Sequence, residues 1–163
     1  MVTQGPQADQ RQYETGLSYI EKGKSSSSLV FRGNGKLEET GGFFVEPTVL
    51  IKTPEDAVIM KEEIFGPVVS INTIKDEAEV IQEANDTEFG LYAAVFTRDI
   101  NRTMRVTKAL QSGNVAVNCT SPILAEDLPF GGYKISGQGR EGWLHSLDNF
   151  QGTKTVPVKV DDD

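Results

Sequence analysis

The sequence predicts an α/β fold built on a parallel β-α-β-α-β sheet with flanking helices, followed by a C-terminal edge strand. Apolar runs at residues 68–73, 91–96 and 114–118 alternate with helical patterns at residues 76–84 and 99–110. Short apolar runs are typical of buried strands, and a strand–helix–strand order favours right-handed crossovers between parallel strands. The length of 163 residues, with 25% charged residues, suits one globular domain.

The elements before this sheet begin with an amphipathic helix over residues 7–24. A short strand is expected at residues 29–31, and a glycine-rich turn separates it from an extended segment at residues 43–51. Three apolar residues define the buried face of the helix because they recur at positions i, i+4 and i+7: Tyr13, Leu17 and Ile20.

Helix ends are marked within the sheet region. Asp76 and Glu79 have the spacing of a capping box, and Gly113 occupies the place of a glycine just beyond a helix. An irregular stretch rich in glycine and proline follows Asn118, and a short helical pattern near residues 143–147 interrupts it.

The C-terminal run, residues 153–160, alternates in polarity. Val156, Val158 and Val160 share one face, and Pro157 removes one backbone donor, which suits an edge strand. A terminal strand with one apolar face must bury that face, and a second subunit is a natural place for it. The sequence therefore predicts a homo-oligomer that forms through this strand.

Charge and composition exclude several classes of partner. The formal net charge is −8, from 16 Lys+Arg and 24 Asp+Glu, and this balance disfavours nucleic acid and anionic membrane surfaces. The apolar runs are far shorter than the roughly 20 residues that span a bilayer. With one cysteine and no secretory signal at the amino terminus, we expect a reducing, cytoplasmic location.

Several motifs allow both a chemical and a structural interpretation. Residues 137–142 (GQGREG) match G-x-G-x-x-G, but a loop precedes them instead of a strand, so a plain loop or a helix entry is favoured over a dinucleotide fingerprint. Cys119 lacks an activating neighbour and His145 lacks a carboxylate at a regular spacing, which favours incidental roles for both. One Cys and one His do not make a metal site. On composition alone, Glu62 and Glu63 indicate a solvated helix face.

A longer string changes the interpretation of this glutamate pair. Residues 61–68 (KEEIFGPV) resemble the aldehyde dehydrogenase signature, in which a glutamate and a phenylalanine two residues later contact the cofactor. Other segments resemble the same family in its own order and extend the resemblance from about Gln4 to Val160: residues 4–9, 42–48, 84–85, 89–91, 94–97, 117–118, 129–132, 136–137, 139–141 and 154–156.

The resemblance implies roles for individual residues. Glu63 corresponds to the glutamate that hydrogen-bonds the nicotinamide ribose hydroxyls, and Phe65 to the ring that packs near the nicotinamide. Phe130 corresponds to an aromatic residue of the aldehyde channel. The variable segment at residues 120–128 shapes the substrate mouth in such enzymes, so the expected channel set is Phe130, Cys119, Ile123 and Leu124. Cys119 is not the family nucleophile, and no catalytic residue is assigned here.

The resemblance also implies what is missing. Residues 1–152 correspond to part of the catalytic domain, and residues 153–163 to the oligomerisation strand with an acidic tail. The dinucleotide-binding domain, the nucleophilic cysteine, the oxyanion-hole asparagine and the glutamate base precede this region in the family. We therefore expect a fragment or shortened member of the NAD(P)-dependent enzymes that convert aldehydes to carboxylic acids, with weak or no NAD or NADP binding and no dehydrogenase activity alone. The alternative is a related protein repurposed as an interaction module or for non-redox chemistry in a biosynthetic pathway.

Overall fold

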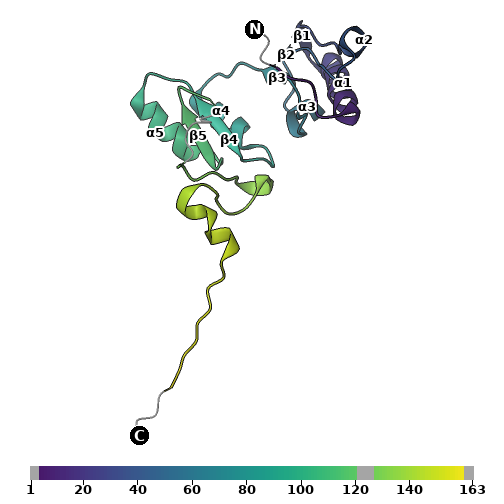
Figure 1. Ribbon diagram of the computed structural model, residues 1–163. Helices are drawn as coiled ribbons and strands as arrows, with labels where there is room; N and C mark the ends of the chain where they lie inside the picture. Colours follow the sequence, from purple (N-terminus) through teal and green to yellow (C-terminus); the bar gives the residue numbers. More distant parts are fainter. Residues whose placement is uncertain (1–3, 121–126, 160–163) are drawn as a thin grey trace. The chain divides into compact units, whose positions relative to one another are not determined.

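The computed structural model describes residues 4–120 and 127–159, and it shows an α/β fold with small sheets (Figure 1). The chain divides into two compact units, Met1–Val80 and Ile81–Asp163. In the part of the chain that the structure describes, no helix combines the length and apolar character needed to cross a membrane. The predicted boundary at residue 152 remains a prediction.

The first unit packs a long helix against a three-stranded sheet. Helix α1 (Gln10–Ser26) begins at the N-cap Asp9, whose carboxylate accepts the Gln12 amide at 2.8 Å. It contacts strands β1 (Ser28–Phe31) and β2 (Thr48–Ile51), and strand β3 (Val68–Ile71) completes the sheet in the order β1-β2-β3. The largest fully buried side chains among the described residues are Ile20, Leu50, Val45 and Thr48.

Strand pairing in this unit is mixed. Strand β2 pairs antiparallel with β1 and parallel with β3, with Leu50 opposite Leu29 on one side and Ser70 on the other. The connection from β2 to β3 contains the short helix α3 (Val58–Lys61), and a second short helix, α2 (Leu37–Thr40), precedes β2.

The second unit contains the central β-α-β element that the sequence predicts. Strand β4 (Tyr92–Val95), helix α5 (Ile100–Ala109) and strand β5 (Asn114–Val117) follow one another, and the two strands pair in parallel. Helix α4 (Glu77–Asn85) contains the division between the units. In the described residues after β5, the structure has three short 3-10 turns: η1 (Lys134–Ser136), η2 (Trp143–Ser146) and η3 (Asp148–Phe150).

The single parallel sheet that the sequence predicts is not confirmed. Strand β3 pairs with β2 in one sheet, and β4 pairs with β5 in another. Strand β3 instead completes a β-α-β element with β2 and α3, in which all four of its residues pair with β2. The four-residue helix α3 is too short to leave a periodic signal in the sequence.

An asparagine extends each parallel strand pair by two hydrogen bonds. After β3, Asn72 Oδ1 accepts the Thr53 amide at 3.0 Å, and Asn72 Nδ2 donates to the Thr53 carbonyl at 2.7 Å. After β5, Asn118 makes the same two bonds to Thr97, at 2.8 and 2.9 Å. A carboxamide can imitate a peptide group in this way because it carries one acceptor and an N–H donor. The same side chain type therefore ends both parallel ladders.

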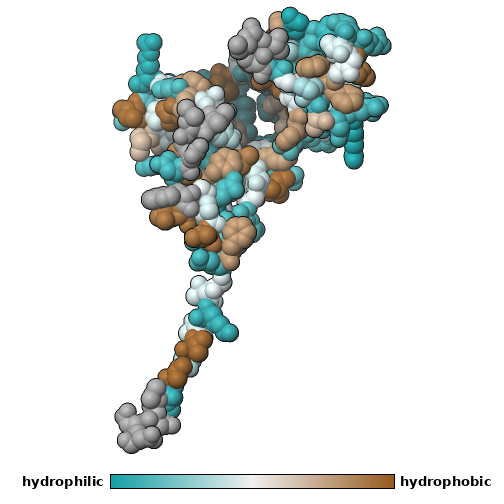
Figure 2. Space-filling view, viewed as in Figure 1, coloured by the Kyte–Doolittle hydropathy of each residue, from teal (hydrophilic) through white to brown (hydrophobic). Residues whose placement is uncertain are grey.

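The C-terminal segment has no strand in this structure. Residues 151–159 carry no regular secondary structure, and Val156 and Val158 are 66% and 75% exposed. Figure 2 shows apolar side chains lying open along this segment. A strand exists only where another strand supplies its hydrogen bonds, and the single chain provides none here. The predicted edge strand is thus not confirmed, and Val160 lies outside the described residues.

Candidate functional site

The loop after α3 carries the two glutamates of the 61–68 motif. Helix α3 ends at Lys61, so Glu62 is its C-cap and neither glutamate lies on a helix face, contrary to the prediction from composition. The two carboxylates differ in their surroundings. Both are exposed, but Glu62 accepts a hydrogen bond from the Tyr19 hydroxyl at 2.6 Å. Glu63 therefore presents its carboxylate to solvent beside an anchored neighbour.

Phe65 adopts an unusual backbone conformation. Its φ of 52° lies in the left-handed region, which costs about 1–2 kcal/mol for a residue with a side chain. Its ring is 75% exposed, so burial of the ring does not offset this cost. Gln12 Nε2 donates to the Ile64 carbonyl at 3.0 Å and to the Phe65 carbonyl at 2.9 Å, which stabilises the conformation. Strain of this kind concentrates at functional sites.

The left-handed backbone at Phe65 leads to a testable prediction about stability. At an ordinary position, glycine is about 0.5–1 kcal/mol less stable than alanine. At Phe65 we expect the order to reverse, with Phe65→Gly more stable than Phe65→Ala by up to about 1 kcal/mol, because only glycine adopts this φ without strain. Urea unfolding of the two variants measures the difference. An alanine variant clearly more stable than the glycine variant would show that the backbone is not held in this conformation.

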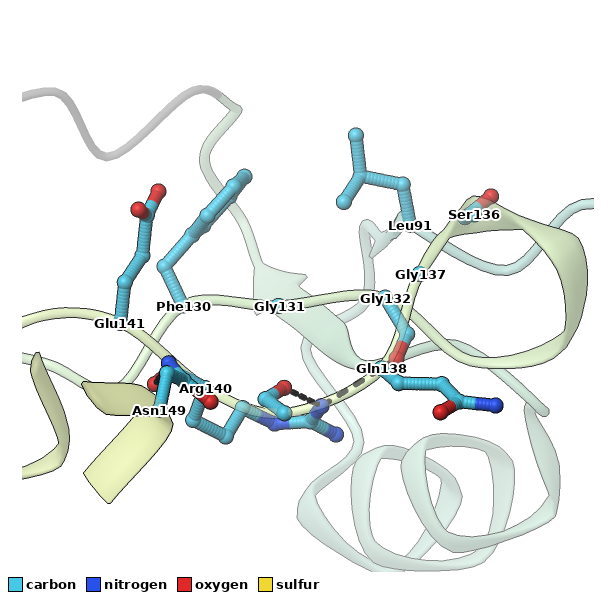
Figure 3. A pocket seen from close by; sticks show the side chains of 11 residues that line it. Leu91, Phe130, Gly131, Gly132, Ser136, Gly137, Gln138, Arg140, Glu141 and Asn149 are labelled. Carbon is cyan, nitrogen blue, oxygen red and sulfur yellow. Dashed lines mark hydrogen bonds between the residues drawn. The ribbon is translucent and has the colours of Figure 1, made fainter. Parts of the chain in front are cut away.

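A second cluster of motif residues surrounds Phe130 in the other unit. Phe130 and Glu141 form an antiparallel bridge, with both N–H to O bonds at 2.8 Å, and Phe130 is 44% exposed. Figure 3 shows their side chains on the same side of the backbone, with Arg140 running along the loop. A cavity of about 210 Å³ lies here, and Leu91 and Asn149 also line it. The structure therefore places Phe130 at an open, partly apolar pocket.

The Phe130 segment is tied to the start of β5. Asn114 Nδ2 donates to the Leu91 carbonyl at 2.8 Å and to the Gly131 carbonyl at 2.9 Å. Gly113 packs directly on this segment, since a Cβ atom at position 113 would lie 1.9 Å from the Gly131 oxygen. Position 113 thus requires glycine for close backbone contact. The predicted helix C′ position is wrong, because α5 already ends at the C-cap Leu110 and Gly113 does not have the positive φ of such a glycine.

The G-x-G-x-x-G segment is a loop, as predicted. Gly137 follows the 3-10 turn η1 and not a strand, and Gly137, Gly139 and Gly142 all have positive φ. Arg140 Nη1 closes the loop by donating to the Gly139 carbonyl at 2.6 Å and the Gly132 carbonyl at 3.2 Å. The backbone therefore lacks the strand-to-helix turn that a pyrophosphate requires.

The remaining candidate residues have varied environments. Cys119 is a free, exposed thiol, and Ile123 and Leu124 lie outside the described residues. The prediction that His145 has no carboxylate neighbour is wrong, because His145 Nδ1 lies 3.4 Å from Asp148 Oδ2. The two residues are three apart across η2 and η3, and side chains at this spacing eclipse in 3-10 geometry.

Sequence reasoning missed a buried carboxylate. Glu46 is 8% exposed, and its carboxylate contacts Arg32 at 2.9 Å, Asn34 at 3.2 Å and Lys36 at 3.4 Å. Burial alone would raise the pKa of Glu46, but hydrogen bonds from these three side chains outweigh it, and the pKa is lowered. Glu46 therefore stays ionised at neutral pH and holds the turn at residues 32–36. Its position in the 42–48 motif was the available signal.

Known proteins are similar to this chain over nearly its whole length. The family model described as "Aldehyde dehydrogenase family" matches residues 1–156. A curated aldehyde dehydrogenase of Agaricus bisporus is 44% identical over 159 residues, which cover 98% of this chain and 31% of that protein. The chain thus spans about a third of the length of this relative.

Solved structures agree with the sequence comparison. Gamma-glutamyl-gamma-aminobutyraldehyde dehydrogenase from Burkholderia cenocepacia J2315 gives a TM-score of 0.86 at 46% identity, covering 90% of this chain and 30% of that one. The NAD+ complex of aldehyde dehydrogenase from Bacillus cereus gives 0.89 at 39% identity, covering 98% and 32%. Because the family model and these structures match nearly all of the chain, the protein belongs to the aldehyde dehydrogenase family of oxidoreductases.

Proposed function

We propose that this chain supplies the nicotinamide-binding loop and part of the aldehyde channel for NAD(P)-dependent oxidation of an aldehyde to a carboxylic acid. The observation that carries the proposal is the strained loop that exposes Glu63 and Phe65 two residues apart. Phe130, with its adjoining pocket, is the candidate channel residue.

The loop suits the cofactor by its chemistry. An exposed carboxylate accepts two hydroxyl protons in a fork, which fits the ribose next to the nicotinamide, and an exposed aromatic ring offers a flat apolar surface for the ring itself. Glu63 and Phe65 would thus hold the cofactor, which when bound accepts hydride from the substrate carbon. These two contacts contribute about 1–3 kcal/mol, whereas micromolar binding needs about 8 kcal/mol. The remaining affinity must come from elsewhere in a complete enzyme.

The chain is expected to be inactive by itself. Related enzymes are about three times as long, and the nucleophile and base that their chemistry needs lie outside the matched third by the resemblance of the sequence. By the same resemblance, Cys119, an exposed free thiol, does not correspond to that nucleophile. Purified chain with NAD+ and a simple aldehyde should form no NADH above background.

A chimera tests the proposed function directly. Replacing the matched third of the Bacillus cereus enzyme by this chain should give NAD-dependent aldehyde oxidation, because the match between the two structures covers 98% of this chain. In that chimera, Glu63→Gln should raise the KM for NAD+ about tenfold, the loss of one charge-assisted hydrogen bond. Glu38→Gln makes the same charge change at another exposed glutamate and should leave the KM unchanged. A folded chimera whose KM ignores Glu63→Gln would refute the role of the loop.

We further expect the chain to self-associate through residues 153–160, as the sequence predicts. Val156 and Val158 are largely exposed in the single chain, and burying a valine is worth about 1.5–3 kcal/mol before entropy costs. Sedimentation of the full chain against a variant ending at Gly152 measures the effect, with a smaller sedimenting species expected after truncation. If both forms are monomers at tens of micromolar, the strand does not drive association. Equal aggregation of both would assign it to other exposed apolar surface.

A further inference from the structure

Helix α1 holds the Glu63 loop at two points. Gln12 and Tyr19 are seven residues apart, close to two helical turns, so both side chains leave the same face of the helix. Tyr19 bonds Glu62 on one side of Glu63, and Gln12 bonds the carbonyls of Ile64 and Phe65 on the other. The exposed carboxylate thus lies between two fixed points on a rigid element.

The Tyr19 contact is a short, charge-assisted hydrogen bond. The Tyr19 Oη to Glu62 Oε2 distance is 2.6 Å, and the hydrogen bond to Glu62 raises the pKa of Tyr19 from its usual range, so the hydroxyl remains a donor at neutral pH. Since Glu62 is the C-cap of α3, this bond also fixes where the helix ends and the loop begins. Glu63 follows directly from that fixed point.

The Gln12 contact acts on the strained residue. The Gln12 amide group donates to two successive carbonyls, that of Ile64 at 3.0 Å and that of Phe65 at 2.9 Å, which belong to the peptides before and after Phe65. Both bonds require the carbonyls to converge on one side, which the left-handed Phe65 backbone permits. Removing the donor therefore removes what offsets the strain.

We infer that Tyr19 and Gln12 are positioning residues that set the orientation of Glu63 and Phe65 for the cofactor. The inference rests on the proposed function of the loop for its consequence, but its conformational part stands on the contacts of this chain alone. The donors are the Tyr19 hydroxyl and the Gln12 side-chain amide group.

The first test measures the loop in the chain itself. The one-bond Cα–Hα coupling of Phe65 distinguishes left-handed from right-handed backbone by NMR. In the double variant Tyr19→Phe with Gln12→Glu, which keeps side chain size but removes both donors, we expect this coupling to shift toward the ordinary value. The matched control is Tyr13→Phe with Gln10→Glu on the same helix, where neither side chain contacts the loop.

The second test measures cofactor use in the chimera with the Bacillus cereus enzyme. The double variant should raise the KM for NAD+ about tenfold with kcat changed less than about threefold, and the control pair should change neither. An unchanged coupling, or an unchanged KM where Glu63→Gln does raise it, overturns the inference and leaves the proposed function standing. If Glu63→Gln has no effect on KM, the proposed function fails, and the coupling alone decides whether α1 holds the loop.

Discussion

Gly113→Ala is expected to lose about 3 kcal/mol of stability in the second unit, the upper end of the usual cost of overpacking. A Cβ atom at this position would lie 1.9 Å from the Gly131 oxygen and 2.9 Å from its carbonyl carbon. These neighbours are backbone atoms, so no side chain rotation relieves the clash. The segment that carries Phe130 must move away from the start of β5, and the Asn114 bond to Gly131 must break with it.

Urea unfolding gives the loss of stability, and amide hydrogen exchange shows where it occurs. Phe130 and Glu141 should exchange faster, because their mutual backbone bonds depend on the same segment. Gly16→Ala is the matched control, since no atom lies within 4 Å of its Cβ position outside the helix backbone. That variant should gain about 0.5–1 kcal/mol from helix propensity. Similar results for both variants would mean that the close contact at Gly113 relaxes freely.

The sequence was informative where local signals determine structure. Helix α1 has the predicted apolar spacing, and helix α5 begins at an aspartate N-cap. Before α4, Asp76 accepts the amides of Ala78 and Glu79, as a capping residue does. The predicted capping box differs in one bond, because the Glu79 carboxylate accepts the Lys75 amide instead of that of Asp76. Such elements depend on residues within one or two turns, so their patterns survive in the sequence.

Strand partners could not be read in the same way. Whether β3 pairs with β2 or β4 depends on segments far apart in the chain, and an apolar run has the same appearance in either case. The predicted C-terminal strand has the same problem, since alternating polarity indicates an apolar face but does not identify the strand that would pair with it.

The sequence identifies some features of the candidate site and not others. Glu63, Phe65 and Phe130 came from motif resemblance, which records the residues but not their conformations. The left-handed φ of Phe65 has no sequence signal because glycine, the usual residue there, is absent. Gln12 lies some fifty residues from Phe65 in the sequence, and Tyr19 lies some forty residues from Glu62. No local pattern therefore connects them to the loop.

Leu50→Ala should produce the other large effect, a loss of about 2–5 kcal/mol in the first unit. Leu50 lies on the central strand β2 and has no exposed surface. Its side chain also fills the space beside Gly23, where a Cβ atom would lie 2.5 Å from Leu50 Cδ1. Because glycine on α1 and leucine on β2 fit together so closely, the cavity left by truncation cannot be filled by a neighbouring side chain at position 23.

Leu29→Ala is the matched control because it removes the same atoms from the residue paired with Leu50. Leu29 lies opposite Leu50 in the β1–β2 register but is 38% exposed, so its truncation removes less buried surface. Urea unfolding should show a clearly smaller loss for Leu29→Ala, and amide exchange in Leu50→Ala should rise first in β1–β3. Equal losses would show that burial in this sheet does not set its stability. Since α1 packs on this sheet and also holds the Glu63 loop, a large Leu50 effect would tie the geometry of the Glu63 loop to the core beneath it.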